Sequence, residues 1–143
     1  MIQIRPCSNE DFEGVLAVLR QLWPDKHIDT AMLRVVYERA LGSPLQHHVC
    51  ALDDAQIVGM GSLSINNNLW REGYLGYVEE LIVDERFRGR GIGTQLLEHL
   101  IGVARAQGCR CVELDAAFHR KEAHRFYEHM GFQSRAYVFS KPL

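Results

Sequence analysis

A glycine-rich turn holds the residues whose types and spacing are best suited to bind an anion. Three alternate glycines lie among three alternate arginines, namely Gly89, Gly91 and Gly93 with Arg86, Arg88 and Arg90. Without a Cβ, glycine lets several backbone N–H groups converge on a ligand, and the arginines add positive charge. A helix that begins at this turn adds about half a positive charge from its dipole. The stretch therefore predicts a site for a phosphate or pyrophosphate.

Two common phosphate-binding patterns do not fit this turn. No lysine follows the glycines, so the GxxxxGK[ST] loop of nucleotide hydrolases is absent. A dinucleotide fingerprint has the spacing GxGxxG directly after a strand, whereas here the spacing is GxGxG and five residues separate Val83 from Gly89. A structural explanation stays open, in which the glycines only let a helix pack closely on a strand and the arginines are a solvated surface.

The periodicity of apolar residues predicts the elements that position this turn. Strands are expected near residues 2–6, 48–52, 57–65, 74–83 and 111–116, with a last bent strand or hairpin over 132–140 and a turn at Asn66–Asn68. Helices are expected over residues 11–23, 29–41, 91–107 and 121–130. A meander followed by a late β-α-β crossover makes the fold class α+β: a mixed, mostly antiparallel sheet flanked by about four helices, in the order β-α-α-β-β-β-α-β-α-β.

Length and composition predict one globular domain over residues 1–143. Hydrophobic residues make up 47% of the chain and charged residues 24%, which is typical of a protein with one core. A net charge of −2 gives no global basic field for a nucleic acid, and no apolar run approaches the ~20 residues that cross a membrane. The N-terminus lacks a secretion signal, so we expect a cytoplasmic protein with neither nucleic-acid nor membrane partners.

Two motifs lie at a fixed separation in the second half of the chain. Arg88-Gly-Arg-Gly-Ile-Gly93 matches the pattern (Q/R)xxGx(G/A), and Glu80-Leu-Ile-Val-Asp84 precedes it. Downstream, Glu122–Phe132 contains the pattern AxxxYxxxGF. Together these segments resemble the GCN5-related N-acetyltransferase (GNAT) superfamily, specifically over residues 80–132 and in element order over about 2–140. The ending of the chain is also similar to aminoalkylphosphonate N-acetyltransferases.

The resemblance implies acetyl transfer from acetyl-CoA to an amine. In this superfamily the amides of the turn bind the CoA pyrophosphate, which assigns that role to Arg88, Gly89, Arg90, Gly91, Ile92, Gly93 and Thr94. Pantetheine lies along the fourth strand, which implies contacts with backbone groups of Leu81, Ile82 and Val83. Many members carry an Asn three residues before the Ala of the last helix, where this chain has Arg120, so a contact near the pantetheine arm would differ.

Acyl transfer to an amine needs a proton acceptor and an acid for the leaving thiolate. A free alkylamine has a pKa near ~10, so a base or a water chain must take its proton before attack. Glu79 and Glu80 are the candidates; neighbouring strand residues face opposite ways, and the resemblance favours Glu80. Tyr127 matches the tyrosine of the last-helix pattern and is expected to protonate the thiolate. Two alternatives stay open. The glutamates could be solvated or paired with arginines, and the tyrosine could serve only in packing.

Other chemistries have less support in the sequence. No HExxH occurs and the histidines near the end recur at a spacing that does not share a helical face, so no metal site is expected. A noncatalytic acyl-CoA-binding or sensing module on the same fold is the alternative to an enzyme. The oligomeric state is left open, with a homodimer as one option.

The acceptor is expected to be a small primary amine, such as a polyamine, an aminoglycoside or an aminoalkyl compound. Acidic residues gather near the expected cleft and favour a cationic acceptor: Glu79, Glu80, Asp84, Glu85 and Asp115. An aminoalkylphosphonate would also need a basic contact such as Arg71, His47 or His48. Specificity is expected to lie in residues 24–48 and 66–77, which contain no transferable motif.

Overall fold

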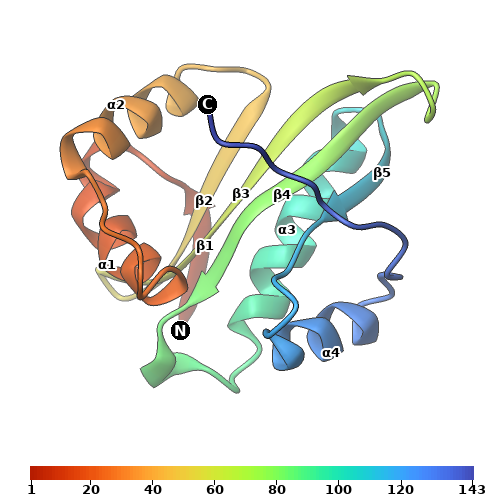
Figure 1. Ribbon diagram of the computed structural model, residues 1–143. Helices are drawn as coiled ribbons and strands as arrows, with labels where there is room; N and C mark the ends of the chain where they lie inside the picture. The colour runs from red at the N-terminus through yellow and green to blue at the C-terminus, as the bar shows by residue number, and fades with distance from the viewer. The chain divides into compact units, whose positions relative to one another are not determined.

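One sheet of five strands organises the chain, and the computed structural model describes it over residues 1–143 (Figure 1). In order across the sheet, the strands are β1 (Ile2–Pro6), β2 (Gln46–Asp53), β3 (Gln56–Asn68), β4 (Gly73–Val83) and β5 (Cys109–Leu114). The helices are η1 (Asn9–Asp11), α1 (Phe12–Leu22), α2 (Thr30–Leu41), η2 (Glu85–Phe87), α3 (Ile92–Ala106) and α4 (Lys121–His129). The expected α+β class, with four α-helices and a mostly antiparallel sheet, is confirmed.

The chain divides into two units, Met1–Glu113 and Leu114–Leu143. The expected single domain over residues 1–143 stays a prediction. Within the first unit, β1 to β4 form an antiparallel meander with two register irregularities, one between Ala51 and Leu52 and one between Ser62 and Leu63. No helix in the structure has the length and apolar character needed to cross a bilayer.

Helices cover both faces of the sheet in the first unit, with α1 and α2 on one face and α3 on the other (Figure 1). Met60 and Ile82 belong to the buried cluster that also contains Phe12 and Val15 of α1. On the opposite face, a Cβ built on Gly61 would lie 3.0 Å from Leu100 of α3. Met60 and Ile82 thus mark the face of α1 and α2, and Gly61 marks the face of α3. Successive strand residues alternate between faces, so the face of each neighbouring side chain can be counted from these residues.

The helix that follows the glycine-rich turn forms where its apolar spacing predicts. Ile92, Leu96 and Leu100 are almost fully buried, as expected for one face of a helix packed on a sheet. The helix starts after Gly91 at φ +80° and is followed by Gly108 at φ +84°. These left-handed conformations favour glycine, so the two residues define both ends of α3.

The hairpin between β3 and β4 corrects one expectation. Asn66–Asn68 were expected to form a turn, but they are the last residues of β3 and pair with Gly73, Tyr74 and Leu75. The reversal occurs over residues 69–72, where the Asn68 side chain accepts a hydrogen bond from the Arg71 amide at 2.9 Å. Asparagine favours turns because its side chain can form such hydrogen bonds. Of the three asparagines, Asn68 makes the bond that stabilises this turn.

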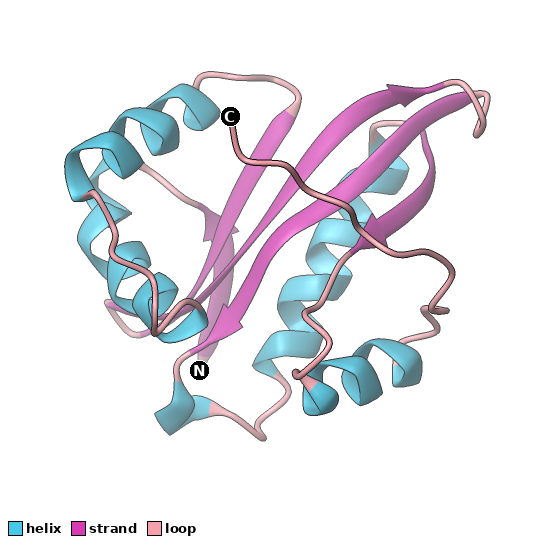
Figure 2. Cartoon of the chain, viewed as in Figure 1, coloured by secondary structure: helices cyan, strands magenta, loops and turns pink.

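The second unit corrects another expectation, the last strand over residues 132–140. Helix α4 ends at His129, and residues 132–143 form neither helix nor strand (Figure 2). The consecutive side chains of Tyr137, Val138 and Phe139 are 72%, 65% and 93% exposed. The alternation in sequence predicted a strand with one buried face, but neither set of alternate side chains is buried.

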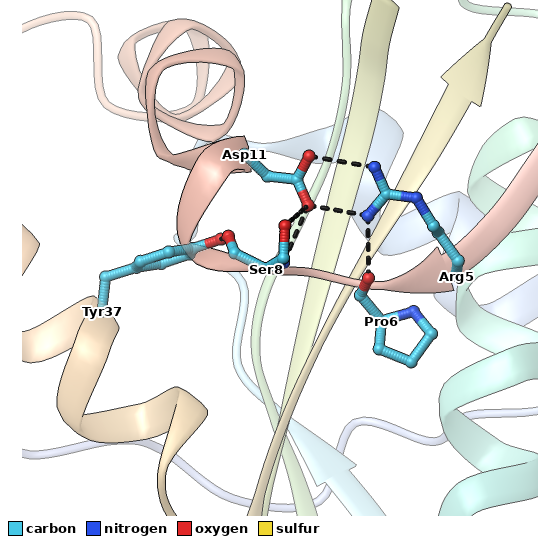
Figure 3. Close-up of polar contacts among 5 residues, drawn as sticks. All are labelled: Arg5, Pro6, Ser8, Asp11 and Tyr37. Atoms are coloured by element: carbon cyan, nitrogen blue, oxygen red, sulfur yellow. Dashed lines mark hydrogen bonds and ion pairs between the residues drawn. The ribbon is translucent and has the colours of Figure 1, made fainter. Parts of the chain in front are cut away.

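A polar cluster joins β1, η1 and α2 in the first unit (Figure 3). Arg5 donates from Nη1 and Nη2 to the two carboxylate oxygens of Asp11, at 2.7 and 3.0 Å. Asp11 also accepts from the amide and hydroxyl of Ser8, at 2.7 and 3.1 Å. The Tyr37 hydroxyl donates to the Ser8 carbonyl at 2.7 Å. The buried carboxylate thus fixes the entry of the chain into α1.

Asp11→Asn is expected to lower the stability of the fold in a pH-dependent way. The hydrogen bond from Arg5 lowers the pKa of Asp11 from 3.8 to about 2. A carboxyl with a lowered pKa stabilises the fold above its unfolded pKa, and this stabilisation is lost as pH falls from about 4 towards 2. The variant should therefore have a lower Tm than wild type at neutral pH, and thermal unfolding should show the two Tm values converging below pH ~4. Equal Tm values at neutral pH would contradict this, and Asp25→Asn, in an exposed loop, is the matched control.

Candidate active site

The glycine-rich turn presents unpaired backbone amides to solvent. Gly89 and Gly91 have φ angles of +77° and +80°, and a Cβ on either would meet no protein atom within 4 Å. The first helical hydrogen bond of α3 runs from the Gln95 amide to the Gly91 carbonyl at 3.0 Å. The amides of the three residues between them therefore have no partner within the helix. This open helix N-terminus fits the anion site expected from the sequence.

The three arginines near the turn have different partners. Arg88 donates from Nε to the Val83 carbonyl at 2.9 Å, and the Arg90 guanidinium lies 5.0 Å from the centre of the Phe87 ring. Arg86 instead pairs with the buried carboxylate of Asp84 at 3.0 Å. The charge of Arg86 is therefore balanced within the protein, and Arg88 and Arg90 are the arginines of the turn without an ion pair.

Asp84 supports the turn rather than adding to an acidic cleft. Its carboxylate accepts from the Arg86 amide at 2.9 Å and from the Arg86 guanidinium at 3.1 and 3.0 Å. The hydrogen bond from Arg86 lowers the pKa of Asp84 to about 2. This neutralised ion pair removes one of the charges on which the expectation of a cationic acceptor rested.

The end of β4 offers a ligand its backbone rather than its side chains. Ile82 is buried in the cluster under α1, and Leu81 lies near Gly61 on the face that α3 covers. Val83 is half-buried, and its carbonyl already accepts from Arg88. The role of the main-chain groups of Leu81, Ile82 and Val83 in binding a cosubstrate therefore stays a prediction.

A β-bulge places the two candidate glutamates differently. Ser62 pairs with Glu80 but Leu63 pairs with Val78, so Glu79 is an extra residue in β4. A Cβ on Gly76 would touch Ala104 of α3 at 3.3 Å, whereas Ile82, an even number of residues later, packs under α1. The bulge therefore moves Glu80 to the face of α1 and α2 and leaves Glu79 exposed.

Glu80 is held by a buried serine that the sequence did not single out. The Ser62 hydroxyl donates to Oε1 of Glu80 and accepts from the Glu80 amide at 3.0 Å. Burial raises the pKa of Glu80, the Ser62 hydrogen bond opposes this, and the nearby Glu79 charge adds to it. Only the strand register brings Ser62 to this position, so no local pattern could have identified it. A carboxyl with a raised pKa is better matched to accepting a proton near neutral pH.

Tyr127 lies on α4 in the second unit, where it is 9% exposed. Its ring contacts Phe126 and Phe132 at centroid distances of 5.3 and 5.9 Å. Burial raises the pKa of Tyr127, Arg120 lowers it and Asp115 raises it. Arg120, which stands where the superfamily often has Asn, is the N-cap residue of α4 and makes no side-chain cap bond.

Of the three basic residues that could contact an anionic acceptor, the arginine is paired with a carboxylate and the two histidines lie on one strand. Arg71 donates to Glu113 at 2.8 Å, so its charge is balanced. His47 and His48 lie on β2, and each has one buried ring nitrogen without a hydrogen-bond partner.

Comparisons with known proteins agree with this fold. A family model described as the Acetyltransferase (GNAT) family matches residues 12–132. An aminoalkylphosphonate N-acetyltransferase of Salmonella typhimurium is 32% identical over 141 residues, covering 99% of this chain and 91% of that protein. A glucosamine 6-phosphate N-acetyltransferase of Oryza sativa subsp. japonica is 30% identical over 135 residues, covering 91% and 80%. An aminoglycoside N-acetyltransferase solved in complex with CoA shares the fold, with a TM-score of 0.89 at 20% identity over 100% of this chain and 95% of that one.

The chain therefore belongs to the GNAT family of acetyltransferases. It is an enzyme of the N-acetyltransferase class, as the sequence motifs predicted.

Proposed function

We propose that this enzyme transfers the acetyl group of acetyl-CoA to the primary amine of a small molecule, by direct attack of the amine on the thioester. The observation that carries the proposal is the bulge in β4. It turns a partly buried carboxyl with a raised pKa, that of Glu80, to one face of the strand that leads into the open amides of the turn. A base and a phosphate cradle on one continuous segment are what acyl transfer from a CoA thioester to an amine requires.

Acetyl-CoA would bind through the residues that the sequence assigned to it. The unpaired amides at the start of α3 and the guanidinium groups of Arg88 and Arg90 suit a pyrophosphate. Leu81, Ile82 and Val83 would contact the pantetheine arm through backbone groups. A solved protein of the same fold is described in complex with CoA, which supports this cosubstrate.

The proposed acceptor is a small amine of the polyamine, aminoglycoside or aminoalkyl classes. The relatives described above act on an aminoalkylphosphonate and on glucosamine 6-phosphate, which supports an amine that also carries an anionic group. The charge of Asp84 is balanced by Arg86, which weakens the electrostatic argument for a purely cationic acceptor. We therefore include anionic amines in the test on equal terms.

The direct test is mass spectrometry of products from an amine panel incubated with acetyl-CoA. The panel contains aminoalkylphosphonates, glucosamine 6-phosphate, polyamines and aminoglycosides. An acetylated amine formed together with free CoA thiol supports the proposed function. Binding of acetyl-CoA without any acetylated product would instead support the alternative, a noncatalytic acyl-CoA-binding or sensing module.

Gly91→Ala is expected to weaken the affinity for acetyl-CoA by a factor on the order of 10 or more. The new methyl group would project into the open space in front of the turn, where the pyrophosphate would lie. Calorimetric titration with acetyl-CoA measures the effect. Gly108→Ala is the matched control, because Gly108 also has a positive φ (+84°) and open space around it but follows the other end of α3. Equal affinities for the two folded variants would contradict the proposed position of the pyrophosphate.

A further inference from the structure

A row of three polar side chains crosses the sheet on the face of α1 and α2. Glu80 on β4 pairs with Ser62 on β3, and Ser62 pairs with His48 on β2. Residues opposite each other on adjacent strands point to the same face, with Cβ atoms about 4.5–5.5 Å apart. The His48 ring lies 5.8 Å from the ring of Tyr37 on α2, which agrees with this face. A carboxyl, a hydroxyl and an imidazole are thus neighbours on three successive strands.

The hydroxyl of Ser62, in the middle of the row, has one proton, which it can donate either to Glu80 or to another acceptor. Ser62 is 1% exposed, and its hydroxyl donates to Glu80 while accepting from the Glu80 amide. When Glu80 is ionised, its carboxylate can only accept the hydrogen bond from Ser62. When Glu80 is protonated, its carboxyl can instead donate a hydrogen bond to the serine oxygen. Protonation of Glu80 would therefore free the Ser62 proton for another acceptor.

His48 offers that acceptor. Its Nδ1 atom is buried and has no hydrogen-bond partner, a situation that costs free energy and is rare in folded proteins. The Ser62 hydroxyl does not reach Nδ1 while it is bonded to Glu80, so the two side chains must rotate towards each other before a proton can pass. The Tyr37 hydroxyl cannot fill the gap, because it donates to the Ser8 carbonyl. Burial lowers the pKa of His48 and the neighbouring His47 lowers it further, so the ring is neutral at pH 7 and one nitrogen carries a lone pair. The ring as a whole is only partly buried, which lets it exchange protons with water.

We propose that Ser62 and His48 relay to solvent the proton that Glu80 takes from the acceptor amine. This inference rests on the proposed acetyl transfer. The ammonium loses a proton to the Glu80 carboxylate; the resulting acid donates to Ser62 Oγ, and the Ser62 hydroxyl proton passes to Nδ1 of His48. The imidazolium then loses its Nε2 proton to water, and Glu80 ends as the carboxylate that it was. A turn of the partly buried ring then exposes Nδ1–H to water, and exchange of that proton restores the first tautomer of His48. One proton leaves the ammonium and one reaches water, and no electrons are transferred.

Other titratable groups face this row, and each must be considered in a pH profile. They are Tyr37 on α2, Cys7 after β1, Cys50 on β2, and Tyr77 and Glu79 on β4, whereas His47 lies on the other face of β2. Burial raises the pKa of Tyr37, so this phenol stays protonated throughout the assay range. Glu79 is the charge that acts on Glu80, and His47 is the one that acts on His48.

His48→Gln and His48→Ala test the relay. Both should lower kcat on the order of 10-fold with KM for the amine nearly unchanged, because the relay acts on the proton and not on binding. Added imidazole should restore kcat in His48→Ala, whereas pyrrole, which has the same ring size but no acceptor nitrogen, should not. His99→Gln makes the same change on α3, which covers the other face of the sheet, and should leave kcat nearly unchanged.

Ser62→Ala gives a second test that leaves the imidazole in place. Loss of the Ser62 hydrogen bond raises the pKa of Glu80, so the acidic limb of the kcat/KM profile should move to higher pH. Imidazole should not rescue this variant, and adding His48→Gln should cost little more, because both changes interrupt one chain.

Three results would overturn the relay. These are an unchanged kcat in folded His48→Gln, a loss that imidazole does not restore in His48→Ala, or a rise in KM for some amines only, which would make His48 a substrate contact. Where the His48 variants do not fold, an unchanged kcat and pH profile in Ser62→Ala would overturn it. A wild-type protein that acetylates no amine overturns the proposed function itself, so the two failures are distinguishable.

Discussion

Replacing Tyr127 by phenylalanine is expected to lower kcat by a factor on the order of 10² and to leave the affinity for acetyl-CoA nearly unchanged. The substitution removes one oxygen and keeps the ring that packs against Phe126 and Phe132. Protonation of the departing thiolate stabilises only the transition state, so its loss affects kcat rather than binding. Steady-state kinetics and calorimetric titration with acetyl-CoA measure the two quantities.

The control for this prediction is Tyr137→Phe, which removes a phenol oxygen from a residue that is 72% exposed in the same unit. It should leave kcat nearly unchanged. A weakened affinity for acetyl-CoA in Tyr127→Phe, or a kcat close to that of wild type, would return Tyr127 to a packing role.

The raised pKa of Tyr127 also predicts the alkaline side of the pH profile. Burial holds the pKa of Tyr127 above its ordinary value of about 10, although Arg120 opposes this. The phenol therefore keeps its proton throughout the range in which the protein would be assayed. An alkaline loss of activity below pH ~10 should persist in Tyr127→Phe, because it arises from another group.

Local patterns predicted the elements well where one face of an element is buried. The spacing of Ile92, Leu96 and Leu100 predicts α3, and Gly91 and Gly108 predict its ends, because both signals lie within the element itself. The strand expected over residues 132–140 is the counterexample. Its apolar residues alternate as those of a half-buried strand do, but the side chains are exposed. A strand also needs neighbouring elements that bury its apolar face, and the alternation does not show whether such neighbours exist.

The sequence could propose those parts of the candidate site that depend on residues close in the chain. The glycine turn and Glu80 lie within one continuous segment, whereas Ser62 and His48 reach Glu80 only through the register of three strands. The bulge at Glu79 likewise depends on how β4 pairs with β3. Arg86 was expected to add positive charge near the turn, and its pairing with Asp84 became visible only in three dimensions. Long-range pairing therefore decides the parts of the site that the sequence left open.

Glu80→Gln is expected to lower kcat/KM by a factor on the order of 10² to 10³ and to remove the acidic limb of its pH profile. The amide preserves the shape of the side chain but cannot take a proton from the amine. Wild-type activity should fall as pH decreases through the pKa of Glu80, because only the carboxylate is a base. Burial raises that pKa, so the fall should begin above the ordinary range for a glutamate. Rate measurements across pH 5–9 at a low amine concentration give the profile.

Glu79→Gln distinguishes the two glutamates by the direction of its effect. The Glu79 charge raises the pKa of Glu80, so its removal should move the acidic limb to lower pH while the limb itself remains. If Glu79 were the base, the limb would instead disappear in Glu79→Gln and persist in Glu80→Gln. A limb that persists in both single variants would pass the role of base to solvent water. Because Glu79 is exposed at the bulge and Glu80 is held by Ser62 and partly buried, the structure favours the first of these outcomes.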